Sequence, residues 1–141
     1  MSLKSAAAAL SVVALLTAGA ARAEIVHFAA PLTGADEVPA NAETGHGVFT
    51  GELETAQKVL VYRATYTGLT GPAVAAHLHG PAAPGVNAPP VVMIPDPTAI
   101  GGAVILTGAQ ADDLLAGKWY FNVHTKAHPG GEIRGQVKRA N

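Results

Sequence analysis

The sequence contains no cysteine. Disulfide bonds, iron–sulfur clusters, blue-copper centres and cysteine-based zinc sites all require cysteine, so each of these is excluded. Serine is almost as restricted, because its three positions, Ser2, Ser5 and Ser11, all lie at the start of the chain. The rest of the chain offers no serine nucleophile, which excludes a serine hydrolase. Without disulfides, the fold must be held together by core burial, unless a metal ion helps.

The sequence also lacks an excess of basic charge. It has 9 Lys and Arg residues against 10 Asp and Glu residues, for a formal net charge of −1 with histidine neutral. Nucleic-acid binding and attachment to an anionic membrane surface both depend on basic patches, so neither is expected. Aromatic residues make up only 5% of the chain, and no ladder of them is visible on which bases or sugars could stack.

Long apolar runs are absent except near the N-terminus. Lys4 precedes an apolar stretch at residues 6–16, and residues 21–23 have the A-x-A pattern of a signal-peptidase site. The stretch is shorter than the roughly 20 residues of a membrane-spanning helix, so a retained membrane anchor is the less favoured alternative. We therefore expect residues 1–23 to be a signal peptide, residues 24–141 to form one domain, and the protein to be periplasmic or secreted.

Glycine and proline are abundant, with 16 and 10 residues, and they divide the chain into short segments. Within these segments apolar and polar residues alternate and β-forming residues are common, which is typical of a sandwich or barrel of short strands. We predict an all-β fold: a Greek-key-like β-sandwich or barrel of about eight short strands. The predicted strands cover residues 25–32, 47–54, 59–67, 73–79, 91–94, 103–106, 118–125 and 132–137.

One segment departs from the β pattern and predicts a single short helix within residues 106–117. Thr107 suits the N-cap position, Gln110 follows three residues later as in a capping box, and Gly117 suits the C-terminal stop. The proline-rich stretch at residues 81–90 separates two predicted strands of the same domain. We therefore expect this stretch to be an ordered loop rather than a linker.

The histidines have the most distinctive pattern in the chain. His77 and His79 are two residues apart in a predicted strand, so strand alternation places them on one face. Their Cα atoms are then roughly 6.5–7 Å apart, and both imidazoles can reach one ion with metal–nitrogen bonds of about 2.0–2.1 Å. The opposite, apolar face of the strand is expected to hold Val74, Ala76 and Leu78.

A second group of polar side chains follows in residues 119–128. Alternation predicts a core face of Trp119, Phe121 and Val123, and an opposite face of Tyr120, Asn122 and His124. If the two strands are neighbours, His124 would be a third ligand, and His128 in the following loop would be a fourth ligand or a contact to one. Glu132 and Asp36 are the acidic residues expected to orient a ligating imidazole.

Imidazole ligands without a thiolate suit Cu(II) and Zn(II). The predicted cofactor is one of these two ions, held by His77, His79, His124 and His128. In the alternative, the imidazoles form hydrogen bonds to backbone carbonyls or to one another, and no metal binds.

The remaining candidate ligands have ordinary structural explanations. His27 and His46 are expected to be surface or half-buried polar residues rather than ligands. Met93 lies in an apolar segment and is expected in the core, where methionine commonly fills gaps, although its thioether could instead be a weak axial ligand.

Several segments together resemble the CHRD family, whose domain is repeated in chordin. The resemblance covers almost the whole predicted domain, and its segments are residues 32–40 (LTGADEVPA), 76–82 (AHLHGPA), 90–92 (PVV), 106–110 (LTGAQ), 114–125 (LLAGKWYFNVHT) and 128–136 (HPGGEIRGQ). It implies a β-sandwich-type module. In chordin this module belongs to an extracellular antagonist of bone morphogenetic proteins, and in bacteria it occurs as short exported proteins. The family's recurring histidines match His77, His79, His124 and His128.

Three functions remain open at this point. The first is an exported protein that binds copper or zinc for buffering or delivery, without catalysis. The second is a non-catalytic interaction module without metal, whose partner is another exported protein or the cell envelope. The third and least favoured is an enzyme like copper–zinc superoxide dismutase, which also has an H-x-H strand; the disulfide cysteines and long metal-binding loop of that family are missing here. No catalytic residue is predicted, and the oligomeric state is left open.

Overall fold

The computed structural model describes residues 23–141. The predicted signal peptide therefore lies outside the described residues, apart from its last position, Ala23. Within residues 23–141, no helix has both the length and the apolar character needed to span a membrane.

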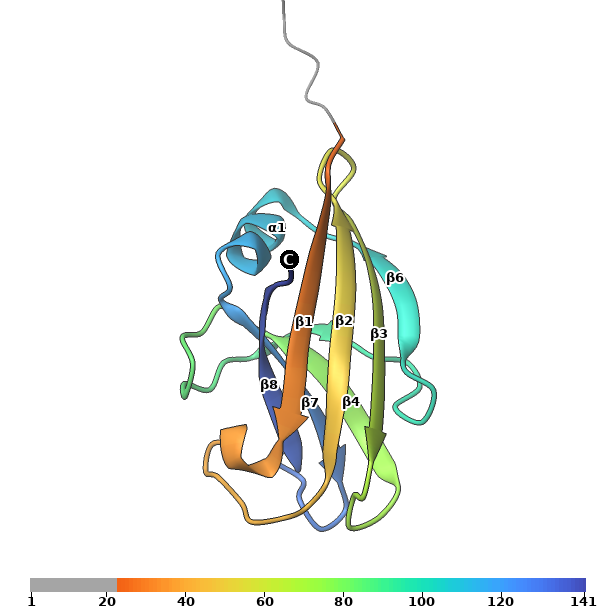
Figure 1. Cartoon of the computed structure of the whole chain (residues 1–141), viewed down its shortest axis with the longest axis vertical. Coiled ribbons are helices and arrows are strands. Elements are labelled where there is room, and N and C mark those ends of the chain that lie inside the picture. The colour runs from red at the N-terminus through yellow and green to blue at the C-terminus, as the bar shows by residue number, and fades with distance from the viewer. Residues whose placement is uncertain (1–22) are drawn as a thin grey trace, which may run out of the picture.

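Eight strands form one antiparallel sheet that curls into a half-barrel. They are β1 (Ile25–Thr33), β2 (His46–Glu54), β3 (Val59–Thr67), β4 (Ala73–His79), β5 (Pro90–Met93), β6 (Gly101–Ile105), β7 (Trp119–Thr125) and β8 (Ile133–Arg139). Their order across the sheet is β5-β4-β7-β8-β1-β2-β3-β6. The curl places β1, β2 and β3 in front of β4, β7 and β8 (Figure 1). The predicted all-β fold of about eight short strands with one short helix is confirmed.

Strand bounds agree closely with the sequence prediction. The third and fourth strands match it residue for residue, and the other bounds differ by at most two residues. A short 3-10 helix, η1 (Gly34–Asp36), follows β1 where the sequence predicted only a loop. Its N-cap is Thr33, whose hydroxyl accepts a hydrogen bond from the backbone N–H of Asp36 at 3.3 Å.

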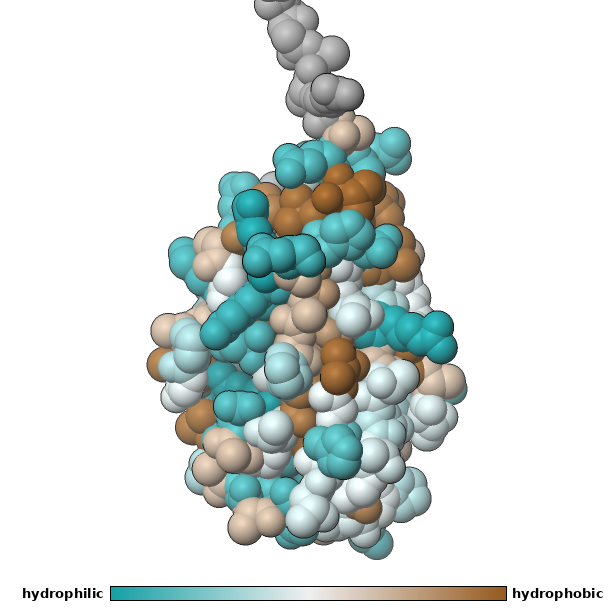
Figure 2. All heavy atoms as spheres, viewed as in Figure 1, coloured by the Kyte–Doolittle hydropathy of each residue, from teal (hydrophilic) through white to brown (hydrophobic). Residues whose placement is uncertain are grey.

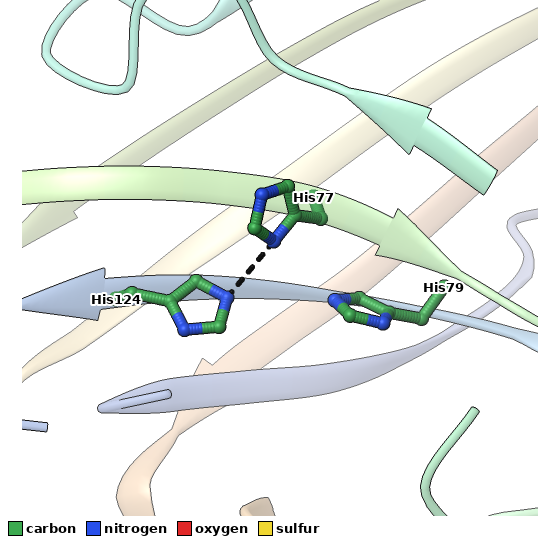
Figure 3. A group of neighbouring side chains, drawn as sticks. All are labelled: His77, His79 and His124. Atoms are coloured by element: carbon green, nitrogen blue, oxygen red, sulfur yellow. Dashed lines mark hydrogen bonds between the residues drawn. The ribbon is translucent and has the colours of Figure 1, made fainter. Parts of the chain in front are cut away.

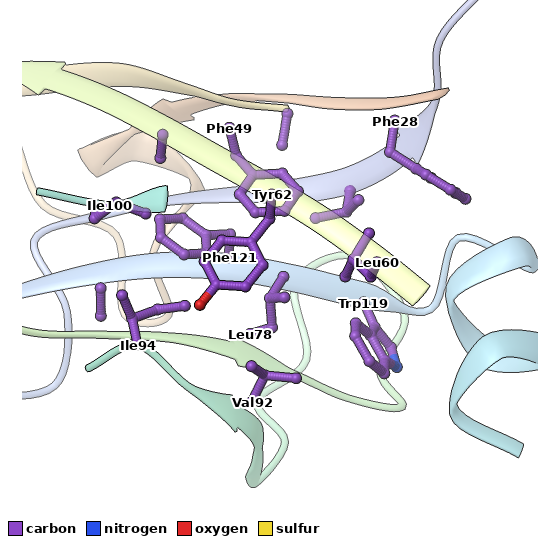
Figure 4. Packing of buried hydrophobic residues seen from close by; sticks show 14 of the residues in the cluster. Phe28, Phe49, Leu60, Tyr62, Leu78, Val92, Ile94, Ile100, Trp119 and Phe121 are labelled. Carbon is purple, nitrogen blue, oxygen red and sulfur yellow. The ribbon is translucent and has the colours of Figure 1, made fainter. Parts of the chain in front are cut away.

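The core lies between the two facing halves of the curled sheet. The ring of Phe49 on β2 stacks on that of Phe121 on β7, with 4.9 Å between the centroids. Trp119, Phe121 and Val123 are fully buried, which confirms the predicted core face of β7. Figure 4 shows this packing, with side chains of both halves in contact. Burial of this apolar surface is the main favourable contribution to folding in a chain without disulfides.

The helix α1 (Gly108–Leu115) is placed as the sequence predicted. The Thr107 hydroxyl accepts a hydrogen bond from the N–H of Gln110 at 3.2 Å, and the Gln110 side chain accepts one from the N–H of Thr107 at 2.9 Å. Gly117 has a φ of +71°, which suits glycine at the end of a helix. The helix buries Ala111 and Leu114 and contacts β8.

The outer surface differs between the two halves of the sheet. On the face shown in Figure 2, apolar side chains are interspersed with polar ones. Strand β2 there has the alternating burial of a strand with one solvated face. Strand β7 is instead buried at all seven positions. The neighbouring strands β4 and β8 pair with the edges of β7 and do not cover its faces. Other segments of the chain must therefore cover its outer face.

The prediction that Val74 shares a face with Ala76 and Leu78 is wrong, since its side chain is 58% exposed. Ala73 and Ala75 on β4 pair with consecutive residues of β7, which leaves Val74 as one extra residue in β4. This β-bulge shifts the alternation, so that before it Ala73 faces the core and Val74 faces outward. Beyond it, Ala76 and Leu78 are fully buried, as predicted.

The predicted core position of Met93 is also wrong, because its side chain is 63% exposed. Met93 pairs directly with His77, and directly paired residues of antiparallel strands point to the same side of the sheet. Met93 therefore shares the outer face with His77, while Val92, which pairs with Leu78, faces the core.

Substitutions on β4 test this assignment of faces. Leu78→Ala removes a fully buried side chain and is expected to lower the free energy of unfolding by about 2–5 kcal/mol. Val74→Ala, at an exposed position of the same strand, should change it by less than about 0.5 kcal/mol. Urea denaturation measures both values. Equal losses in the two variants would contradict the bulge and the faces derived from it.

Candidate metal centre

The outer face of β7 carries polar side chains, and two loops bury them. Tyr120, Asn122 and His124 are all buried on this face. The loop at residues 80–90 lies against the face, where the Tyr120 hydroxyl donates a hydrogen bond to the carbonyl of Ala88 at 3.2 Å. Glu37, which follows η1, interacts with Asn122. Buried polar groups need hydrogen-bond partners, so this face must form a polar network.

Three histidines gather in this network, two from β4 and one from β7 (Figure 3). Ala75 pairs with His124, and His77 pairs with Asn122, so the side chains of these residues lie on one face. One ring nitrogen from each of His77, His79 and His124 lies within 4.8 Å of the others. The Nδ1 of His77 and the Nε2 of His124 are 3.0 Å apart. These three histidines could therefore hold a metal ion.

The spacing of the three nitrogens is less even than in an occupied site. Metal–nitrogen bonds of about 2.0–2.1 Å place the ligand nitrogens of a tetrahedral site roughly 3.4 Å apart. The pair from His77 and His124 already lies closer than this, at 3.0 Å. The nitrogens lie up to 4.8 Å apart, so the widest pair would have to close by as much as about 1.4 Å on binding, through rotation of the side chains.

His79 is held by both its ring face and its Nδ1. Its Nδ1–H donates a hydrogen bond to the carbonyl of Ala88 at 2.8 Å, and its ring stacks on Tyr120 with 4.7 Å between the centroids. A neutral imidazole carries one ring proton, so the Nε2 of His79 has a lone pair. That Nε2 is buried and has no aligned hydrogen-bond partner among residues 23–141.

His124 has the same arrangement. Its Nδ1–H donates a hydrogen bond to the carbonyl of Pro129 at 3.0 Å, which leaves a lone pair on Nε2. The proton between this Nε2 and the Nδ1 of His77 therefore belongs to His77. A histidine whose Nδ1–H is held by a backbone carbonyl while Nε2 faces inward has the second-shell arrangement typical of metal-binding histidines.

Burial keeps all three imidazoles neutral. Burial, together with smaller effects of the neighbouring His124 and His79, lowers the pKa of His77 to about 4. Burial also lowers the pKa of His79 and of His124, against the opposing effect of the hydrogen bonds to Ala88 and Pro129. Neutral imidazole is the form that binds metal, so these ligands need not lose a proton to solvent near neutral pH.

The other predicted residues lie elsewhere. His128 does not join the three-histidine group, and its Nε2 lies 3.2 Å from the carboxylate of Glu43. The Glu132 carboxylate accepts hydrogen bonds from Thr70 and Thr125, and the Asp36 carboxylate accepts one from Thr33. Backbone carbonyls therefore orient the imidazoles, in place of the predicted carboxylates.

His27 and His46 also stay outside the group. Both are exposed: the Nδ1 of His27 lies 3.6 Å from Glu52, and the Nδ1–H of His46 donates to the carbonyl of Thr44 at 3.1 Å. These are the surface contacts that the sequence predicted.

Arg134 is a residue of the site that sequence reasoning missed. It is only 2% exposed, and its guanidinium donates hydrogen bonds to the Asn87 side chain at 2.9 Å and the Val86 carbonyl at 2.8 Å. The guanidinium also lies 3.5 Å from the centroid of the Tyr120 ring. Arg134 thus anchors the loop whose Ala88 carbonyl orients His79. Strand alternation could have placed it beside Asn122, with which it pairs.

Glu37 is the second missed residue. Its side chain is 6% exposed, and burial raises its pKa to about 7, against the opposing effects of Arg134, the backbone N–H of Val38 and the side chain of Asn122. Its Oε1 is buried and has no aligned hydrogen-bond partner among the described residues. No pattern in the sequence distinguished this carboxylate from the exposed ones.

The fold and the site define a small antiparallel β-module with a buried group of three histidines that could hold a metal ion. Residues 28–137 match the family model of the CHRD domain. The chain belongs to the CHRD domain family, as its motifs indicated. No curated protein and no solved structure gives a significant match to this chain.

The neutral imidazoles predict that stability falls in mild acid. In the unfolded chain the three histidines bind protons as the pH falls below about 6.5, whereas the folded state resists protonation down to about 4 for His77. The unfolded state binds more protons in this window, so stability is lost as the pH falls through it. Glu37 has the opposite effect, because its raised pKa favours the folded state at low pH and this contribution is lost as the pH rises towards 7.

Urea denaturation with a chelator present, at pH 7.5 and pH 5, measures this dependence. The wild-type midpoint is expected at a lower urea concentration at pH 5. The variant His77→Gln should show a smaller difference between the two pH values, and His46→Gln, at an exposed histidine outside the group, should show the wild-type difference. An unchanged difference in His77→Gln would contradict the neutral, buried state assigned to this imidazole.

Proposed function

We propose that this protein binds one Cu(II) or Zn(II) ion through His77, His79 and His124. The observation that carries the proposal is the orientation of two buried imidazoles. In His79 and His124, a backbone carbonyl accepts the Nδ1–H hydrogen bond, so the lone pair of each ring is on Nε2, and one ring nitrogen of each of the three histidines lies within 4.8 Å of the others. Three imidazoles without a thiolate suit Cu(II) and Zn(II).

A hydrogen-bond network alone explains these contacts less completely. It accounts for the bonds to Ala88 and Pro129 and for the bond between His77 and His124. It leaves the Nε2 of His79 buried without an aligned partner, and such a group costs about 1–3 kcal/mol. A bound ion would recover this loss. Because the hydrogen-bond network explains most of the contacts but not this one, the interaction module without metal is the second candidate.

Metal binding would also rearrange one proton. In the metal-free protein, the Nδ1–H of His77 points at the Nε2 of His124. An ion bound to both nitrogens would replace this proton, which would move to the Nε2 of His77. The half-buried position of His77 leaves a route by which solvent can exchange this proton.

We further propose that the protein acts outside the cytoplasm, as a metal-binding, buffering or delivery protein. The support is the signal-peptide pattern of residues 1–23. Recovery of a periplasmic or secreted form that begins at Glu24 tests this proposal, and a cytoplasmic form with Met1 or Ser2 at its N-terminus would contradict it.

Metal content and thermal stability test the binding proposal. After incubation with Cu(II) or Zn(II) and desalting, the purified protein is expected to retain about one equivalent of at least one of these ions. An ion that binds only the folded state at a hundredfold excess over Kd adds about 2.7 kcal/mol of stability, so the melting temperature should rise. The double variant His77→Ala/His79→Ala should lose both effects. The control His27→Ala/His46→Ala, at exposed histidines, should keep them.

Retention of less than roughly a tenth of an equivalent by the wild type, with no thermal shift, would contradict the proposal and favour the interaction module. Unchanged binding in the His77→Ala/His79→Ala variant would show that any bound metal lies elsewhere. A dismutase assay on the copper-loaded protein tests the enzyme alternative directly.

A further inference from the structure

Asn122 lies at the centre of the three-histidine group. It pairs directly with His77 across the β4–β7 ladder, and its Oδ1 lies 3.0 Å from the Nε2 of His124. Its side chain also interacts with His79. Only 3% of Asn122 is exposed, so these contacts, rather than water, must satisfy its amide.

The contact between Asn122 and His124 brings two acceptors together. The proton of His124 is on Nδ1, where it is bonded to Pro129, so Nε2 offers only a lone pair. An amide oxygen likewise offers only lone pairs. The proton on the Nδ1 of His77 points at His124 and supplies one donor for the two acceptors. A cation between the amide oxygen and the imidazoles would satisfy both acceptors at once.

Glu37 explains why the amide oxygen faces the histidines. Its Oε1 and the Nδ2 of Asn122 lie together over Gly131, where an added Cβ would overlap with both atoms. The Nδ2 of Asn122 is thus the amide atom on the side of Glu37, with which the Asn122 side chain interacts. An amide whose nitrogen is turned towards a carboxylate presents its oxygen on the other side, which here is the side of His79 and His124.

We propose that the Oδ1 of Asn122 is a fourth ligand of the metal ion, and that Glu37 is the residue that positions this oxygen. The proposal rests on the binding function proposed above, and it names the fourth atom that binds the metal ion. Three imidazole nitrogens and one amide oxygen form a closed four-ligand set, as in structural rather than catalytic zinc sites. A borderline-to-hard ligand set of this kind favours Zn(II), Co(II) and Cu(II) over Cu(I). The closed set also accounts for binding without catalysis.

A competing arrangement has the amide turned by 180°. The Nδ2 would then donate to the Nε2 of His124, and Oδ1 would face Glu37, which would have to be protonated to donate a hydrogen bond. In that arrangement Asn122 is a structural partner of His124 and not a ligand. Replacing the amide by groups with and without an oxygen donor separates the two arrangements.

The experiment compares Zn(II) and Co(II) binding by the wild type, Asn122→Leu and Asn122→Asp. Leucine has a similar size but no donor atom, whereas aspartate keeps an oxygen at the same position. Asn122→Leu is expected to weaken Zn(II) binding at least about tenfold, measured by competition with a chelator, and to change the visible absorption of bound Co(II). Asn122→Asp should keep the affinity within about tenfold of the wild type, with a four-coordinate Co(II) spectrum. Circular dichroism checks folding, and Asn122→Ala replaces the leucine variant if that variant does not fold.

A measurement on the unchanged protein supplements the variants. The side-chain NH₂ resonances of Asn122 are expected to shift on addition of Zn(II), because the oxygen of the same amide binds the ion. The resonances of Asn41, whose NH₂ donates to the Glu132 carbonyl away from the three histidines, serve as the control.

Glu37→Gln should weaken Zn(II) binding less than Asn122→Leu and leave the four-coordinate Co(II) spectrum unchanged, as expected of a positioning residue.

The outcomes distinguish this inference from the function on which it rests. If the wild type binds neither Zn(II) nor Cu(II), the proposed function fails. If the wild type binds and Asn122→Leu shows the same affinity and the same Co(II) spectrum, Asn122 is not a ligand, while the three-histidine site stands. Weak binding by both Asn122→Leu and Asn122→Asp would overturn the inference as well, since an oxygen at this position would then not suffice.

Discussion

Burial of strand β7 on both of its faces is the constraint on which the rest of this structure depends. The inner face is apolar, and Phe121 stacks on Phe49 of β2, so β7 joins the two halves of the curled sheet. The outer face is polar, yet it is buried as deeply as the inner one. Most donors and acceptors there must find partners within the protein, because little water reaches them. The site is the result of this requirement.

The polar network assigns a separate task to each of its parts. Arg134 holds the proline-rich loop in place, and the loop supplies the carbonyl that orients His79. The turn after β7 supplies the carbonyl of Pro129, which orients His124. Desolvation keeps the imidazoles uncharged, which is the form that binds metal ions. One cause, burial beneath two loops, thus accounts for the tautomers, the lowered pKa values and the shared direction of the ring nitrogens.

Sequence reasoning identified the three histidines and the Asn122 that shares a face with His124, because strand alternation is local. His77 and His79 had to share a face, and Asn122 had to share one with His124. Register was not visible in the sequence: the bulge at Val74 and the pairing of Met93 with His77 each moved an apolar side chain to the outer face. The predicted carboxylate partners of the imidazoles are wrong, because backbone carbonyls have that role. The buried Glu132 is fully engaged by Thr70 and Thr125, and the backbone orients the imidazoles in its place.

The sequence by itself determined the strands, the capped helix and the pairing of side chains on each face, since these follow from spacing and from contacts within a few residues. Only the tertiary structure decided that β4 and β7 are neighbours, that loops cover their outer face, and that Glu37 and Arg134 flank Asn122. Most of those outcomes depend on contacts between residues far apart in the chain, such as Glu37 and Asn122, which are 85 positions apart. The histidines and Glu37 lose their water only when such distant segments pack around them, so no local sequence pattern predicts this desolvation.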